Sequence, residues 1–166
     1  MALALAVPAS ARAQAQSELG LKLAVARFYR PDVQQTVIDA FCAVPFTILD
    51  PMGRSRDDVA IFRIGVTVRD SAGLELLRES WVQQVAARLL RIQHGSAAEH
   101  FRFVARAGRY TLDVVVTDSA TGRRSAASTV VDAYAAPPGV SDLLLTTGIR
   151  AALVSATERF KLMLAR

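Results

Sequence analysis

The sequence predicts a mainly β fold, an antiparallel β-sandwich of about seven strands followed by a short C-terminal helix. Apolar and polar residues alternate along most of the chain, which is typical of strands with one buried and one wet face. Turn residues separate these stretches at short intervals, as in sandwiches. An apolar content of 52% excludes a disordered chain, and 166 residues suffice for one domain with a core.

The predicted sandwich occupies residues 21–145. Its strands cover residues 21–29, 36–46, 60–69, 74–81, 99–105, 110–118 and 123–134, and a further short apolar strand is expected at 142–146. Beyond Trp81 the pattern fits either a strand end or a helix, so we expect an irregular or short helical crossover up to Leu90. The three strands within 99–134 are interpreted as a three-strand antiparallel meander.

The strand at 110–118 is the clearest source of core residues. Its four apolar residues on one face are Tyr110, Leu112, Val114 and Val116. We expect them to be buried together with Phe62 and Trp81. The break before Tyr110 is typical of immunoglobulin-like domains, in which a tyrosine near the start of the sixth strand bonds back to upstream backbone. The sequence therefore predicts an immunoglobulin-like sandwich.

Two loops share one turn chemistry. Asp70-Ser-Ala-Gly73 and Asp118-Ser-Ala-Thr-Gly122 each place an aspartate before small residues and a glycine. A calcium site would need roughly six to eight oxygen ligands, and one carboxylate per turn is too few. We therefore expect Asx-turns, in which the aspartate side chain accepts a hydrogen bond from the backbone two residues on.

The two ends of the chain differ from the sandwich. Residues 1–15 join an apolar run to Ala11-Arg12-Ala13, which resembles a secretory signal peptide without its basic start. We expect an exported protein of the periplasm or cell surface, with an Ala-rich disordered tail as the alternative. No apolar run reaches the roughly 18 residues that cross a bilayer. Residues 150–166 are rich in helix formers, so a loosely held helical tail is expected there.

The net charge of +5 comes almost wholly from arginine, since Lys22 and Lys161 are the only lysines. A nucleic-acid surface gathers basic residues on one face. Here one arginine pair precedes the strand at 110–118 and another follows it. A strand of that length separates the pairs by roughly 20 Å at about 3.3 Å per residue. We predict no nucleic-acid partner.

Catalytic, cofactor-binding and metal-binding residues are not predicted. The two histidines, His94 and His100, have no cysteine beside them and no recognised metal-site spacing. Cys42 lies among apolar residues and is expected to be a buried hydrophobe. The chain has no Gly-x-Ser-x-Gly elbow and no Gly-rich phosphate loop. We therefore expect a protein that is not an enzyme and has no cofactor.

Five segments are familiar in combination: Arg27-Phe-Tyr-Arg-Pro, Asp39-Ala-Phe-Cys-Ala-Val-Pro-Phe, Val68-Arg-Asp-Ser-Ala-Gly, Gly108-Arg-Tyr-Thr-Leu-Asp-Val and Ser141-Asp-Leu-Leu-Leu. They resemble the N-terminal β-sandwich region of exported bacterial proteins named for a Gly-Trp-x-Thr-Asp (GWxTD) domain. The resemblance covers about residues 21–150, and the naming motif itself is absent. It implies a fragment or a stand-alone copy of that sandwich, with no activity and no site residues to carry over.

The predicted function is a structural or protein-interaction role for an exported, non-enzymatic module, with a protein as its partner. A carbohydrate-binding module of the cell envelope is the alternative. Phe101 and Phe103 share one face of a strand, and a row of exposed aromatic rings could hold a sugar. Aromatic residues in alternating strands are more often part of the core.

Overall fold

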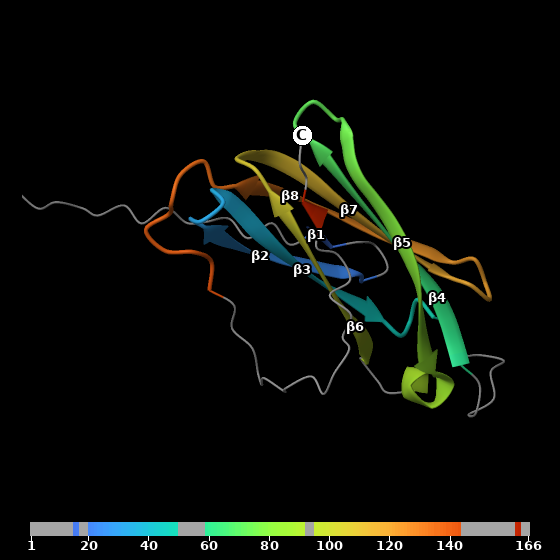
Figure 1. The fold of residues 1–166 in the computed structure, drawn as a ribbon. Helices are drawn as coiled ribbons and strands as arrows, with labels where there is room; N and C mark the ends of the chain where they lie inside the picture. The colour runs from blue at the N-terminus through green and yellow to red at the C-terminus, as the bar shows by residue number, and fades with distance from the viewer. Residues whose placement is uncertain (1–14, 17–19, 50–58, 92–94, 144–161, 164–166) are drawn as a thin grey trace, which may run out of the picture.

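The chain folds into two antiparallel sheets that form a sandwich (Figure 1). The computed structural model describes residues 15–16, 20–49, 59–91, 95–143 and 162–163. One sheet has the strand order β2 (Lys22–Arg30), β3 (Gln35–Pro45), β6 (Ser96–Ala105). The other has the order β5 (Glu75–Ala86), β4 (Val59–Asp70), β7 (Gly108–Asp118), β8 (Arg124–Ala133). The predicted mainly β sandwich of seven antiparallel strands is confirmed.

Two short strands border the three-stranded sheet. β1 (Ala15–Gln16) pairs antiparallel with β2, and β9 (Leu162–Met163) pairs parallel with β6. The helix predicted for residues 150–166 is therefore wrong at Leu162 and Met163, and the rest of that tail lies outside the described residues. Helix propensity is a weak preference, and pairing with a free strand edge overrides it here.

The strand predicted at 142–146 is also wrong where it can be compared. Asp142 and Leu143 have no strand conformation, and the remaining residues of that stretch lie outside the described part. Across the described ranges the single helical element is the 3-10 turn η1 (Ala87–Arg91), which follows directly on β5. This turn lies in the segment between Trp81 and Leu90, for which the sequence predicted an irregular or short helical crossover.

The predicted three-strand meander over 99–134 is wrong for its first strand, because β6 and β7 belong to different sheets, whereas the predicted pairing of the second and third strands, β7 and β8, is confirmed. β6 pairs with β3, whereas β7 pairs with β4 and β8. Arg106 and Ala107 carry the chain across from one sheet to the other. Alternation shows that a segment is a strand and which face is apolar, but it does not show which strand lies beside it.

The core lies between the sheets and consists of the strand side chains that point inward. All four predicted β7 residues are buried, as is Phe62. Trp81 is only partly buried and contacts Phe101 edge to face, with ring centroids 6.0 Å apart. Cys42 is buried, as its apolar surroundings predict.

Both predicted Asx-turns are present. Asp70 Oδ1 accepts hydrogen bonds from the backbone N–H groups of Ala72 and Leu74, each at 2.9 Å. Asp118 Oδ1 accepts from the N–H of Ala120 at 3.4 Å, and its Oδ2 accepts from the Thr121 hydroxyl at 2.7 Å. Each aspartate carboxylate thus stabilises the turn to which it belongs.

The predicted tyrosine contact forms at the crossover between the sheets. The Tyr110 hydroxyl donates to the carbonyl of Arg106 at 2.9 Å. Gly108, at φ +154°, lies under the ring, and a Cβ there would approach the Tyr110 hydroxyl to 3.4 Å. Burial raises the pKa of Tyr110, so its hydroxyl keeps the proton that it donates.

Candidate functional site

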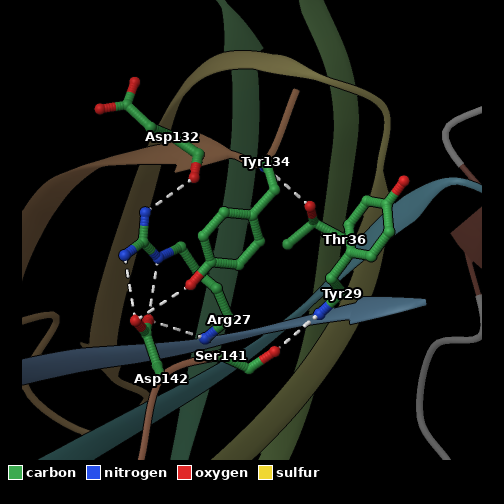
Figure 2. A network of polar contacts seen from close by, with 7 residues as sticks. All are labelled: Arg27, Tyr29, Thr36, Asp132, Tyr134, Ser141 and Asp142. Atoms are coloured by element: carbon green, nitrogen blue, oxygen red, sulfur yellow. Dashed lines mark hydrogen bonds and ion pairs between the residues drawn. The ribbon is translucent and has the colours of Figure 1, made fainter. Parts of the chain in front are cut away.

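A polar network joins the segment after β8 to the edge of β2 (Figure 2). Arg27 on β2 donates from Nε to Asp142 Oδ2 at 2.8 Å and from Nη2 to Oδ1 at 3.0 Å. The backbone N–H of Arg27 donates to Asp142 Oδ2 at 3.0 Å, and the N–H of Asp142 donates to the Arg27 carbonyl at 3.1 Å. The Ser141 hydroxyl accepts from the N–H of Tyr29 at 3.2 Å. We call this the Arg27–Asp142 clasp.

Residues of β3 and of the end of β8 complete the clasp. The Tyr134 hydroxyl donates to Asp142 Oδ1 at 3.2 Å, and its ring lies 4.8 Å from the Arg27 guanidinium carbon. The Thr36 hydroxyl accepts from the N–H of Tyr134 at 2.8 Å. Arg27 Nη1 also donates to the carbonyl of Asp132 on β8 at 3.0 Å. Because β2 and β8 belong to different sheets, the clasp ties the two sheets together along one seam.

The electrostatics of the clasp suit a structural role. Burial acts to raise the pKa of Asp142, but the hydrogen bonds and charge of Arg27 outweigh it and hold the pKa below its usual range. The hydrogen bond to Asp142 raises the pKa of Arg27. Both groups are therefore charged at neutral pH and bonded to each other. Neither is poised to accept or release a proton in a reaction.

Another carboxylate, the buried Asp39, faces outward from the three-stranded sheet. Its side chain is 6% exposed. Arg102 donates to its two oxygens at 2.7 and 2.9 Å, and His100 Nε2 lies 2.8 Å from Oδ1. Burial acts to raise the pKa of Asp39, but the hydrogen bonds of Arg102 and His100 outweigh it and lower the pKa. The His100 ring stacks on Phe41, with centroids 4.8 Å apart.

Among the described residues, the Asp39–His100 pair has no third member that would complete a catalytic group. Nucleophilic catalysis needs a serine, threonine or cysteine hydrogen-bonded to the histidine. In the described part of the chain the one side-chain hydrogen-bond partner of His100 is Asp39. Burial raises the pKa of Cys42 to about 12, so its thiol is a poor nucleophile at neutral pH.

The remaining polar candidates do not converge either. No three His, Cys, Asp or Glu side chains gather in a metal-binding group within the described ranges. His94 lies outside those ranges. Phe101 and Phe103 are buried in the core, so they cannot form the exposed row that a sugar would need.

Exposed apolar residues gather instead on the outer face of the four-stranded sheet, at the start of β4. Val59, Ile61 and Val82 are 47%, 39% and 44% exposed. Val82 on β5 lies opposite Arg63, two residues along β4 from Ile61, so the three apolar side chains are neighbours on one face. We call these three residues the β4–β5 patch. The sequence carried a signal for it, because the first residues of β4 are apolar on both faces.

A basic row borders this patch. Arg63 lies opposite Thr117 on β7, which lies opposite Arg124 on β8, so the two arginines are about two strand spacings, or roughly 10 Å, apart on one face. Neither forms an ion pair with a described residue, whereas Arg69 on the same strand pairs with Asp113. Positive charge and exposed apolar surface thus lie side by side.

Comparison with known proteins identifies no relative: no protein-family model, no curated protein and no solved structure matches the chain. Within the described ranges, no helix combines the length and the apolar character that crossing a bilayer requires.

Proposed function

We propose that the chain is an exported, non-enzymatic module that binds a partner protein through the outer face of its four-stranded sheet. The observation that carries the proposal is the β4–β5 patch beside Arg63. Contiguous exposed apolar surface is uncommon on proteins that act alone and marks interaction sites. The buried polar groups of the described residues are meanwhile engaged in the fold, since none of their side-chain nitrogens or oxygens lacks a hydrogen-bond partner. Export rests on the leader-like residues 1–15.

We further propose that the sandwich is immunoglobulin-like. Counted along the sandwich, the first, second and fifth strands share one sheet, as strands A, B and E do in immunoglobulin domains. The third, sixth and seventh share the other, as C, F and G do, and the fourth strand borders the third. The hydrogen bond of Tyr110 to Arg106 lies at the corner between the fifth and sixth strands, where immunoglobulin domains place their tyrosine.

The chemistry of the face indicates the kind of partner. Apolar contacts would bury Val59, Ile61 and Val82, which stabilises a complex by roughly 25 cal/mol per Å² of apolar surface before the costs of association. Arg63 and Arg124 have no acidic partner among the described residues and would pair with carboxylates. A complementary surface therefore has apolar side chains at its centre and Asp or Glu at its rim.

Photo-crosslinking in the host cell tests this function. A photoreactive residue at Val82 or at Ile61 should give an adduct with the same single protein. Ser128 on β8 is the matched control, because it is exposed on the same sheet face away from the patch. Arg63→Glu should reduce the Val82 adduct at least tenfold, since it would repel the acidic rim.

The charge control is Arg106→Glu, which reverses an exposed arginine at the crossover between the sheets. This variant should leave the adduct unchanged. The proposal fails if Val82 and Ser128 give the same adducts, or if the adducts are nucleic acid or glycan. It fails equally if Val82 and Ile61 give none.

A further inference from the structure

β5 is an edge strand with one unpaired side. It pairs with β4 alone, and no described strand lies beyond it. Proteins commonly protect such edges with proline, lysine or a bulge, because unpaired N–H and C=O groups can pair with other strands. β5 contains neither proline nor lysine, and the register shift lies near the hairpin, at Val68 and Arg69 on β4. Most of the edge is therefore regular.

The hydrogen bonds of β4 show which backbone groups of β5 face this edge. The Ile61 carbonyl accepts from the N–H of Ser119, which directly follows β7, so the odd-numbered residues of β4 bond toward β7. Its even-numbered residues then bond toward β5, where they lie opposite odd-numbered residues. The even-numbered residues of β5 direct their N–H and C=O groups to the edge: Arg78, Ser80, Val82 and Gln84.

The inward side chains of β5 are incompletely covered. Those at Glu79, Trp81, Gln83 and Val85 are only partly buried, whereas every inward side chain of β8, at the opposite edge of the same sheet, is buried. Gln83 Nε2 donates to Glu99 Oε2 on β6 at 2.9 Å. A side-chain amide has two N–H groups, so one donor of Gln83 remains available.

A second copy of the chain fits this edge. A two-fold axis perpendicular to the sheet sets two β5 strands antiparallel, with their inward faces on the same side. With the axis at Trp81, this residue lies opposite its own copy. Leu77 then lies opposite Val85, so apolar side chains face each other. Glu79 lies opposite Gln83, whose second N–H can donate to the carboxylate.

Glu79 favours this register over its neighbours. A charged side chain on the inward face of an edge strand opposes pairing, since it would be buried without a partner. An axis at Glu79 sets two carboxylates opposite each other. An axis at Ser80 sets Glu79 opposite Trp81, and an axis at Val82 sets it opposite Val85. Among these positions, the axis at Trp81 alone gives the carboxylate a hydrogen-bond donor.

We propose that β5 pairs with β5 of a second copy, antiparallel and with the two-fold axis at Trp81. The two four-stranded sheets then form one continuous sheet. Ser80 exchanges backbone hydrogen bonds with Val82 of the other copy, and Arg78 does so with Gln84. The dimer does not depend on the proposed partner complex, because it uses the edge of β5 and leaves the outward side chains of the β4–β5 patch uncovered.

Proline at an edge position tests the pairing. The Ser80 N–H faces the edge, so Ser80→Pro removes a donor to the other copy but no bond to β4. Ser128→Pro is the matched control. The N–H of Asp118 on β7 donates to the Arg123 carbonyl, so the even-numbered residues of β8 also face away from their neighbouring strand.

Sedimentation of the full chain should show a dimer. Its dissociation constant should rise at least about tenfold in Ser80→Pro and less than about twofold in Ser128→Pro. A chain that stays monomeric up to about 0.1 mM would overturn the proposal. A dimer that Ser80→Pro leaves intact would overturn it as well.

Disulfide trapping tests the register without proline. Glu79→Cys and Gln83→Cys are prepared as separate single variants. In the dimer, positions 79 and 83 of the two copies form a non-hydrogen-bonded pair with Cα atoms about 4.5 Å apart, within reach of a disulfide. The native Cys42 can stay, because it is buried and burial raises its pKa to about 12.

An equimolar mixture of these variants should form a disulfide between two chains at least about tenfold faster than either variant alone. In either variant alone, the two cysteines lie about four residues, or roughly 13 Å, apart along the strands. Faster trapping of Glu79→Cys with itself would overturn this register. No disulfide in the mixture would overturn the pairing of the two β5 strands.

Discussion

Single side chains on β7 and β8 differ sharply in burial. Val114 is 0% exposed and Val130 is 49% exposed. We expect Val114→Ala to lower the free energy of unfolding by about 1–3 kcal/mol, because buried methyl groups are lost and a cavity remains. Val130→Ala should change it by less than about 0.5 kcal/mol. Denaturant unfolding measures both, and equal small effects would mean that the inward face of β7 is misassigned.

The hydroxyl of Tyr110 makes a testable contribution at the sheet crossover. Tyr110→Phe removes the hydrogen bond to the Arg106 carbonyl but keeps the buried ring, so we expect a loss of about 0.5–1.5 kcal/mol. Tyr29→Phe is the control, because no hydrogen bond of the Tyr29 hydroxyl is found among the described residues. Equal losses in the two variants would assign the effect to something other than this bond.

The lowered pKa of Asp142 predicts how the clasp responds to acid. A carboxyl group whose folded pKa is below its unfolded value, about 3.9, stabilises fully above that value. This stabilisation is lost as the pH falls through the folded pKa. Burial alone would raise the pKa of Asp142, but the hydrogen bonds and charge of Arg27 outweigh burial and lower it.

We therefore expect Asp142→Asn to unfold more easily than the natural chain at pH 7, with the difference shrinking below about pH 4. Thermal unfolding across this range measures it. Asp32→Asn is the control: its side chain is 55% exposed in a surface ion pair, and such pairs contribute little. A difference for Asp142→Asn that stays constant with pH would show that its charge is not the cause.

At the scale of elements, the hairpin turn between β4 and β5 depends on a backbone conformation. Gly73 has a φ of +82°, and a Cβ there would meet no atom within 4 Å. Gly73→Ala should therefore cost about 1–2 kcal/mol from conformation alone. Gly139 also has open space around it, but its φ is not in the left-handed region, so Gly139→Ala should be near neutral. Chemical denaturation of the pair distinguishes backbone strain from crowding, and an equal cost would refute the strain argument.

At the scale of the whole molecule, export predicts a shorter mature chain. Cleavage after the Ala-x-Ala segment would leave an N-terminus near Gln14 or Gln16. Loss of Arg12 would lower the net charge from +5 to +4. Mass spectrometry of the protein purified from its host measures the terminus. An intact Met1 would contradict export by this route.

Much of the fold could be predicted from the sequence because its signals are local. Alternation over a few residues located the seven main strands and the buried face of β7. Aspartates placed before small residues and glycine predicted the two Asx-turns, and the break before Tyr110 predicted its backbone contact. An apolar neighbourhood predicted the burial of Cys42. Each of these features depends on residues within one strand or one turn. There, the alternation of side chains and their hydrogen-bonding chemistry determine the local structure.

Only the tertiary structure decided that β6 pairs with β3 and that β7 pairs with β4. β6 and β7 follow each other along the chain but lie in different sheets, because each buries its apolar face against the opposite sheet. Arg27 and Asp142 are 115 residues apart, and no spacing rule connects them. Leu162 and Met163 lie in a segment rich in helix formers, but they pair with the edge of β6. Such contacts join residues that are distant in the sequence and meet only after the strands have assembled. A pattern of neighbouring residues therefore cannot predict them.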